Sequence, residues 1–450
     1  MMRCILASWL FICPVSILAQ VQPDVTGSAP ASEMSLGDLL KSASSFNGQI
    51  EEARQDVEIA RAQLKQANAA WYPKASAVVL GAPIFAETGD AVHSQSDWGK
   101  WGPLVTGGFQ IVQPVFTFGM ISNYQKAAEG QIAAKEKLTE VKRAEIFVTA
   151  KEMYYSYQMA NDLYNLVETL SKFLREAVDT AEKQKKEKGS IKPHDLYHLK
   201  TALDDLDQKK LYAKQGRQTA EKAILWVTKA SVAGIAVTEL IPEKFQKKTL
   251  EQYLEIARAN RPEFVALAKG QEARGALRDA KRAQSYPIVF LGAFGQTAWC
   301  PVRTKQDSIF ANDPYNQTVG GFGLGVKFDL EFARHSAEAA EQEAEMMKLK
   351  ATESYAAPGI ELQVKKAFWE LEQAIDGLEV ATRRKQTSRK WFISSGMGWS
   401  VGITPPKDLM EALEGDGLSR KNYIETVFSH NMALARLSQA VGMEVTELKY

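Results

Sequence analysis

The chain has 450 residues, of which 45% are hydrophobic and 24% are charged, and its formal net charge is +1. This length predicts about two to three domains at ~150 residues each. The near-zero net charge argues against a nucleic-acid partner, because binding to phosphates requires an excess of Lys and Arg on one face.

The first 19 residues have the pattern of a secretory signal peptide. Arg3 provides a short positive region, residues 4–18 form an apolar run, and Ala19 precedes a polar stretch. The apolar run is shorter than a membrane-spanning helix requires. We therefore expect a signal peptide at 1–19 and an N-terminal extension at 20–34, followed by an exported mature chain.

Two of the three cysteines, Cys4 and Cys13, lie inside this signal. Cys13 is a poor candidate for lipid attachment, because the bulky Ile12 precedes it where a small residue is preferred. The mature chain would keep only Cys300, so no intramolecular disulfide is expected.

The rest of the chain contains a tandem repeat, which is the first thing to seek in a long sequence. Three landmarks recur in the same order, at spacings of 214, 213 and 213 residues. They are Tyr72-Pro73 with Tyr286-Pro287, Gly107-Gly108-Phe109 with Gly320-Gly321-Phe322, and Pro193 with Pro406, each proline followed two residues later by Asp-Leu.

Each half has the same predicted elements: a helical segment, two strands, a very long helix, a Gly/Pro corner and a final helix. The first structural repeat is expected at 35–232, with strands at 74–85 and 104–118, a long helix at 121–188 and a tip at 188–195. After a linker at 233–248, the second repeat is expected at 249–450, with strands at 288–299 and 318–330, a long helix at 334–398 and a tip at 401–409.

The two long helical segments have apolar residues at intervals of three and four, as in Leu163, Leu166, Leu170 and Leu174. Helices of about 65 residues would be ~100 Å long at 1.5 Å per residue, a length that indicates coiled-coil packing. Pro358 is expected to kink or break the second long helix. Gly415-Asp416-Gly417 predicts a local irregularity in the final helix.

The clearest strand, 318–330, alternates strictly between two kinds of residue. Phe322, Leu324 and Val326 fall on one face, and Gly323 and Lys327 fall on the other. In a soluble sandwich the apolar face would be core, whereas in a membrane barrel it would face lipid. Four strands cannot close a barrel, so strands that span a membrane would have to be shared among several chains.

The pattern resembles the TolC family of outer-membrane efflux proteins. The residues that carry the resemblance are Gln113-Pro114-Val115-Phe116, the corners 188–191 and 401–404, and Ala440-Val441-Gly442. The resemblance implies a mainly α fold with a membrane β-barrel part. Three chains would form a helical tunnel and a shared 12-stranded barrel in the outer membrane, with the tunnel projecting into the periplasm.

The family is a passive exit duct in multi-component efflux or type I secretion, so the resemblance implies no enzyme activity and no cofactor. It implies four kinds of contact: two further copies of the chain, outer-membrane lipid, a periplasmic adaptor (membrane fusion protein) and an inner-membrane transporter. The competing interpretation is a soluble periplasmic coiled-coil scaffold or adaptor protein, which explains the long helices equally well but the alternating strand less well.

The resemblance also implies two sites at the corners. The adaptor would dock on the tip residues Gly189, Ser190, Ile191, Val401, Gly402, Ile403 and Thr404. Asp408 and Glu411 would narrow the pore, and threefold symmetry would turn them into rings of carboxylates. A second interpretation of Asp408, compatible with the first, is that it caps the final helix.

His194 and His198 are spaced i, i+4, so both imidazoles fall on one helical face, as zinc hydrolases require. The sequence identifies no third ligand for a metal, and the second residue of the motif is Asp rather than Glu. We therefore interpret them as exposed residues at a helix start and expect no metal site there.

Overall fold

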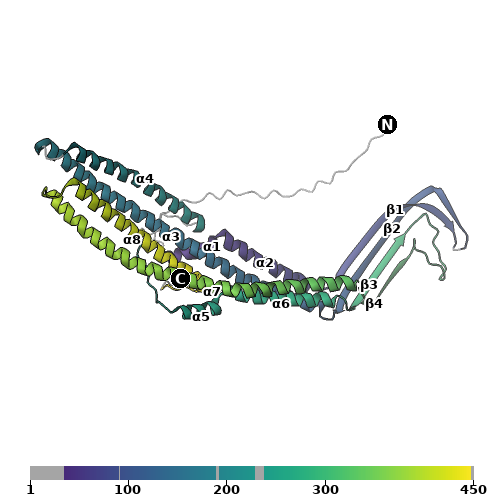
Figure 1. Cartoon of the computed structure of the whole chain (residues 1–450). Helices are drawn as coiled ribbons and strands as arrows, with labels where there is room; N and C mark the ends of the chain where they lie inside the picture. Colours follow the sequence, from purple (N-terminus) through teal and green to yellow (C-terminus); the bar gives the residue numbers. More distant parts are fainter. Residues whose placement is uncertain (1–34, 91, 189–191, 229–237, 447–450) are drawn as a thin grey trace, which may run out of the picture.

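The computed structural model describes residues 35–90, 92–188, 192–228 and 238–446. Helices form one end of an elongated chain and a sheet forms the other (Figure 1). The expected signal peptide and extension, part of the expected linker, and the tip residues Gly189, Ser190 and Ile191 lie outside the described residues. Within the described residues, we find no helix that is both long and apolar enough to span a membrane.

The two halves of the chain contain the same series of elements. The first half has α1 (Leu36–Phe46), α2 (Gly48–Ala69), β1 (Lys74–Gly89), β2 (Ser94–Phe116), α3 (Met120–Lys188) and α4 (Pro193–Thr228). The second half has α5 (Leu250–Asn260), α6 (Pro262–Ala283), β3 (Ile288–Trp299), β4 (Thr318–Lys327), α7 (Phe332–Ser400) and α8 (Pro406–Val441). Matching helices have identical lengths of 11, 22, 69 and 36 residues. The tandem duplication is therefore confirmed.

The repeat extends to the way in which the first helix of each half begins. Ser35 and Asp38 form a capping box at α1, and Thr249 and Gln252 form the equivalent box at α5. In each box the hydroxyl accepts a backbone N–H while the second side chain accepts the N–H of the cap residue. The same local chemistry thus starts both halves.

The long helices α3 and α7 run the whole length of the helical part (Figure 1). At 69 residues each, they are ~100 Å long. Shorter helices pack along them, α2 and α4 on α3 and α6 and α8 on α7, while α3 also contacts α6 and α8. The predicted apolar spacing in α3 is confirmed, because Leu166, Leu170 and Leu174 are buried in a core cluster that joins α3, α4, α7 and α8.

The strands form one antiparallel sheet in the order β1-β2-β3-β4, so β1 and β4 are its edges. β1 continues four residues beyond its expected end, and β2 begins ten residues before its expected start but ends two residues before its expected end. β4 ends three residues earlier than expected. Pro83 and Pro103 do not end their strands, and they face each other across β1 and β2. Both are tolerated because β1 is an edge strand and Pro103 lies beyond Val105, where pairing with β3 ends.

The structure contradicts two of the irregularities that were expected in the helices. Helix α7 passes through Pro358, so the expected break there is wrong, whereas a kink at this position stays a prediction. Proline removes the hydrogen bond to the carbonyl four residues earlier; here that residue is Ser354, and because it is exposed, water can satisfy its carbonyl group.

Helix α8 likewise continues through Gly415 and Gly417. A Cβ atom at Gly415 would lie 2.7 Å from the ring of Trp391, and one at Gly417 would lie 3.0 Å from Leu170. The two glycines therefore allow α7 and α3 to approach α8 closely, which offsets their low helix propensity.

Candidate functional site

The turn between α7 and α8 is a Schellman motif, in which a left-handed residue ends the helix. Gly402 has φ +78°. Its N–H donates to the carbonyl of Trp399 at 3.0 Å, and the N–H of Ile403 donates to the carbonyl of Gly398 at 2.8 Å. Gly402 thus has a backbone role, since a left-handed conformation is costly for other residues.

The turn rests on a buried core. Trp399 and Phe392 of α7 pack with Leu409 and Leu413 of α8, and the same cluster includes Leu199 of α4. Both helical hairpins therefore share one core near the tip, which fixes the position of the turn relative to α3 and α4.

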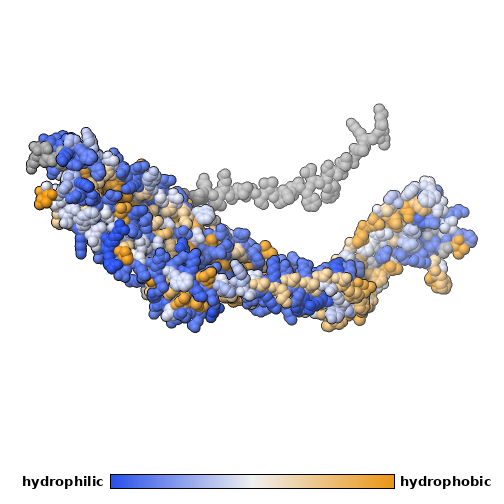
Figure 2. Space-filling model, viewed as in Figure 1, coloured by the Kyte–Doolittle hydropathy of each residue, from blue (hydrophilic) through white to orange (hydrophobic). Residues whose placement is uncertain are grey.

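Three large apolar side chains at this end of α7 are exposed in the single chain: Met397, Val401 and Ile403, the last with 79% of its surface accessible. Figure 2 shows a small hydrophobic area at this end of the otherwise largely hydrophilic helices. Thr404 is half-buried, because its hydroxyl lies over Gly398, where a Cβ would be only 2.1 Å away. The structure therefore presents Val401, Gly402 and Ile403 on the surface of a well-defined turn.

Asp408 and Glu411 are both exposed in the first part of α8. Pro405 is the N-cap residue of α8, and no side chain caps this helix end. The expected cap by Asp408 is therefore wrong. Its carboxylate nevertheless lies in the first turn of α8, where a negative charge interacts favourably with the helix dipole and stabilises the helix. Lys407 lies 3.8 Å from Glu411 and partly offsets its charge.

The sequence analysis did not predict that the carboxylate of Asp416, a few residues further along α8, is buried. Asp416 is fully buried, with one oxygen, Oδ2, 3.5 Å from Arg389 of α7 and 3.8 Å from Arg420 of α8. Its other oxygen has no hydrogen-bond partner among the described residues. The charged pair ties α8 to α7, and the Gly-Asp-Gly sequence was the signal of this close packing.

At the opposite end of the chain, the sheet has a predominantly apolar face. The register places Leu324 opposite Leu291, and Phe322 opposite Ala293, which in turn lies opposite Ile111. Phe322 is 94% exposed, and Leu291 and Leu324 are exposed as well. Figure 2 shows hydrophobic residues along this sheet.

The other face of β4 carries glycines and Lys327. The ring of Phe290 covers Gly325, where a Cβ would lie 2.5 Å from it, and the ring of Phe294 lies 3.3 Å from the corresponding point at Gly321. Aromatic rings on cross-strand glycines hold the register of a sheet. The alternation expected in this strand is thus reproduced, with large apolar residues on one face only of β4.

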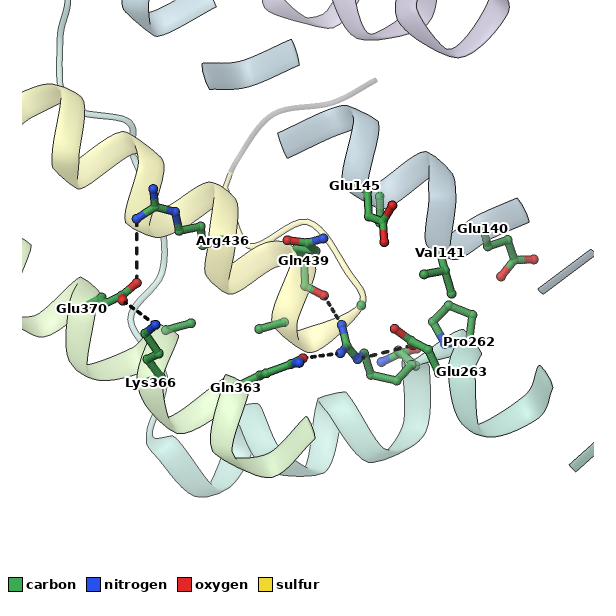
Figure 3. Close-up of a pocket in the computed structure, with 16 residues that line it drawn as sticks. Glu140, Val141, Glu145, Pro262, Glu263, Gln363, Lys366, Glu370, Arg436 and Gln439 are labelled. Atoms are coloured by element: carbon green, nitrogen blue, oxygen red, sulfur yellow. Dashed lines mark hydrogen bonds and ion pairs between the residues drawn. The ribbon is translucent and has the colours of Figure 1, made fainter. Parts of the chain in front are cut away.

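A cavity of about 720 Å³ lies between α3, α7, α8 and the junction of α5 with α6 (Figure 3). Arg261 crosses its wall, where it donates to the carbonyl of Gln439 at 2.9 Å and to Gln363 at 2.8 Å, and lies 3.4 Å from Glu263. The 16 lining residues, all within the described part, include no Ser, Cys or His. Arg261 therefore joins α8 to α7 beside the cavity. The cavity wall lacks the pair of a Ser or Cys nucleophile and a histidine base that nucleophilic catalysis commonly uses.

His194 and His198 lie at the start of α4 with ring centroids 6.5 Å apart, and both are exposed. Within the described residues, no third histidine, cysteine or carboxylate completes a metal-binding group with them.

Comparison with known proteins gave one family match. The sequence model of a family described as outer membrane efflux protein matches residues 39–227 and 253–443. No match was found among curated protein sequences.

Solved structures gave further matches. A membrane protein from Pseudomonas aeruginosa is 16% identical, with a TM-score of 0.72, over 90% of this chain and 93% of that one. CusC is 15% identical, with a TM-score of 0.74, over 93% and 96% of the two chains. The open state of the MtrE outer membrane channel of Neisseria gonorrhoeae is 15% identical, with a TM-score of 0.72, over 94% of each chain. These likenesses show a shared fold.

Proposed function

The chain belongs to the outer membrane efflux protein family, and from this premise we propose that three copies assemble side by side into one duct. As a member of this family, the protein is an outer-membrane efflux channel of a multi-component system, with its helical tunnel in the periplasm. The family is a channel rather than an enzyme family. The competing interpretation as a soluble periplasmic scaffold or adaptor is therefore set aside.

The observation that supports the trimer is the exposed four-stranded sheet. Among the described residues, no further strand pairs with the outer edge of β1 or β4, although Glu87 near the end of β1 forms backbone hydrogen bonds with residues 302 and 304; the apolar face of β4 is uncovered. In lipid, each unpaired backbone group costs several kcal/mol. If β4 of each copy pairs with β1 of the next, three copies of a four-stranded sheet close a 12-stranded barrel and leave no edge.

The molar mass of the assembled protein tests this proposal. We expect light scattering of protein extracted in mild detergent from the outer-membrane fraction to give three chains per particle. A monomer recovered mainly from the soluble periplasm would contradict it, because such a chain would have left its sheet edges unpaired in water.

We assign the α7–α8 turn as the docking site of a periplasmic adaptor, which would link the channel to an inner-membrane transporter. The support is the exposed apolar group Met397, Val401 and Ile403, presented on the Schellman turn with Gly402 and Thr404. The corner at Gly189, Ser190 and Ile191 occupies the matching position in the first repeat and is assigned to the same surface.

We assign Asp408 and Glu411 to the narrow periplasmic end of the pore. Both side chains are free of the core, so symmetry would arrange six carboxylates around a threefold axis, which favours cations over anions. Lys407 weakens the negative electrostatic potential of these carboxylates, because its ammonium group lies 3.8 Å from Glu411.

The ion selectivity of the channel in a planar bilayer tests this assignment. Asp408→Asn with Glu411→Gln is expected to move the reversal potential in a salt gradient toward that of a nonselective pore. Lys407→Gln is the matched control and is expected to shift it in the opposite direction, toward stronger cation preference. A reversal potential unchanged in both variants would place these residues outside the pore.

A further inference from the structure

The connection from β4 to α7 brings together two carboxylates and a histidine. Asp329 lies in this connection, Glu331 is the N-cap residue of α7, and His335 lies on the first turn of the helix. One potential ligand atom from each residue lies within 4.8 Å of the others. The backbone fixes part of this arrangement, because the N–H of His335 donates to the carbonyl of Glu331 at 3.0 Å.

The side chain of His335 is the unusual member of this cluster. It is only 2% exposed, and its Nδ1 atom has no hydrogen-bond partner among the described residues. Its Nε2 atom faces Asp329 Oδ2 at 3.9 Å, which is too long for a hydrogen bond. A buried polar atom without a partner costs about 1–3 kcal/mol, so the imidazole is unsatisfied at Nδ1, while its other nitrogen, Nε2, faces the carboxylate of Asp329.

The charges around the cluster leave a carboxylate available. Arg334 contacts Oε2 of Glu331 and donates from Nε to Glu338 at 3.0 Å, while Lys281 donates to Glu338 at 2.8 Å. These hydrogen bonds from Lys281 and Arg334 lower the pKa of Glu338 to about 2. Arg334 is thus shared between two carboxylates. In the described part of the chain, the ion-pair partner of Asp329 is His335.

We propose that Asp329, Glu331 and His335 bind a divalent transition-metal ion, for which Zn²⁺ is the best fit. Zn²⁺ accepts imidazole nitrogen together with carboxylate oxygen. Ca²⁺ and Mg²⁺ prefer sets of six or more oxygen ligands, which an imidazole does not provide. Arg334 contacts Oε2 of Glu331, and in the described part of the chain no ion pair involves Oε1, which the metal could use.

The geometry requires a modest adjustment. Tetrahedral Zn²⁺ with ligand distances of ~2 Å separates its ligand atoms by ~3.3 Å, which is shorter than the present limit of 4.8 Å. Asp329 and Glu331 are exposed and can move, whereas His335 is held in the core. Three protein ligands leave the fourth position for water. The ion would fix the point where the sheet passes into the long helix, and this site does not depend on the proposed assembly or docking.

Equilibrium dialysis of the purified full-length protein in detergent, first freed of metal with a chelator and then exposed to Zn²⁺ alone, tests the proposal. We expect one tightly bound Zn²⁺ per chain in the unmodified protein. Asp329→Asn and His335→Gln are each expected to weaken this binding at least about tenfold. His194→Ala with His198→Ala is the matched control, because it removes an exposed histidine pair elsewhere, and it is expected to retain the ion.

Two results would overturn the site. One is unchanged Zn²⁺ binding in Asp329→Asn, and the other is a loss of the ion confined to the His194/His198 variant. His335 is buried, so His335→Gln can fail to fold; Asp329 lies on the surface, and its variant decides the question without it. Co²⁺ in place of Zn²⁺ adds a spectroscopic check, because the visible absorption of the bound ion should change when the imidazole is removed from its coordination sphere.

Discussion

Leu324→Lys is expected to prevent stable assembly of the trimer in the outer membrane, whereas Gly323→Lys in the same strand is expected to assemble. Leu324 lies on the apolar face of β4 opposite Leu291, and Gly323 points to the other face. A lysine facing lipid costs about 2–4 kcal/mol at the bilayer midplane. Threefold symmetry would place three such charges in one barrel, so the penalty multiplies.

The comparison of the two lysine variants is well matched. They add the same side chain to adjacent positions, and a Cβ at Gly323 meets no atom within 4 Å. The measurement is the amount of trimer in the outer-membrane fraction, separated by native electrophoresis. Equal amounts of trimer from both variants would mean that Leu324 does not face lipid.

The tandem fold was accessible from the sequence because its signals are local and occur twice. The landmarks at Pro73 and Pro287, and the spacing of leucines in the long helices, depend only on periodicity. The limits of β1 and β2 were less accessible, because Pro83 and Pro103 are tolerated where no further strand pairs with them, and the sequence does not display which strands pair.

The errors in the helices also arise from a three-dimensional environment that the sequence does not display. Proline and glycine were expected to interrupt α7 and α8, since both have low helix propensity. Tertiary packing overrides this preference at Gly415, where the glycine admits the ring of Trp391. At Pro358, the carbonyl group that loses its helical hydrogen bond belongs to an exposed residue and can be hydrated. The local sequence reveals neither the ring that packs on Gly415 nor the exposure near Pro358.

Some residues of the candidate sites were likewise identified from the sequence, and others were not. Val401 to Thr404 were identified through a family resemblance, and the structure adds the reason for Gly402, which is its left-handed backbone. Asp416 was treated only as part of an irregular helix, because its partner Arg389 lies 27 residues earlier, on another helix. His335 was overlooked because it comes close to Asp329 and Glu331 only where β4 passes directly into α7, and the sequence does not show the geometry of this connection.

Ile403→Asp is expected to reduce export at least about tenfold while leaving the amount of outer-membrane trimer unchanged. Ile403 is 79% exposed in the single chain, so the change removes little from the fold. Loss of a buried isoleucine contact is worth about 1.5–3 kcal/mol, and 1.4 kcal/mol corresponds to a tenfold change in affinity. The measurement is resistance of the host to exported compounds, compared with a strain that lacks the gene.

Ile309→Asp provides the control for this substitution. Ile309 is 91% exposed and lies in the connection between β3 and β4, at the other end of the molecule, so it carries the same chemical change away from the proposed docking surface. Gly402 is a less suitable position, because any side chain there strains a left-handed backbone with φ +78°. Reduced export in Ile403→Asp alone would therefore report on docking rather than folding. Normal export in that variant would exclude the α7–α8 turn as the adaptor site.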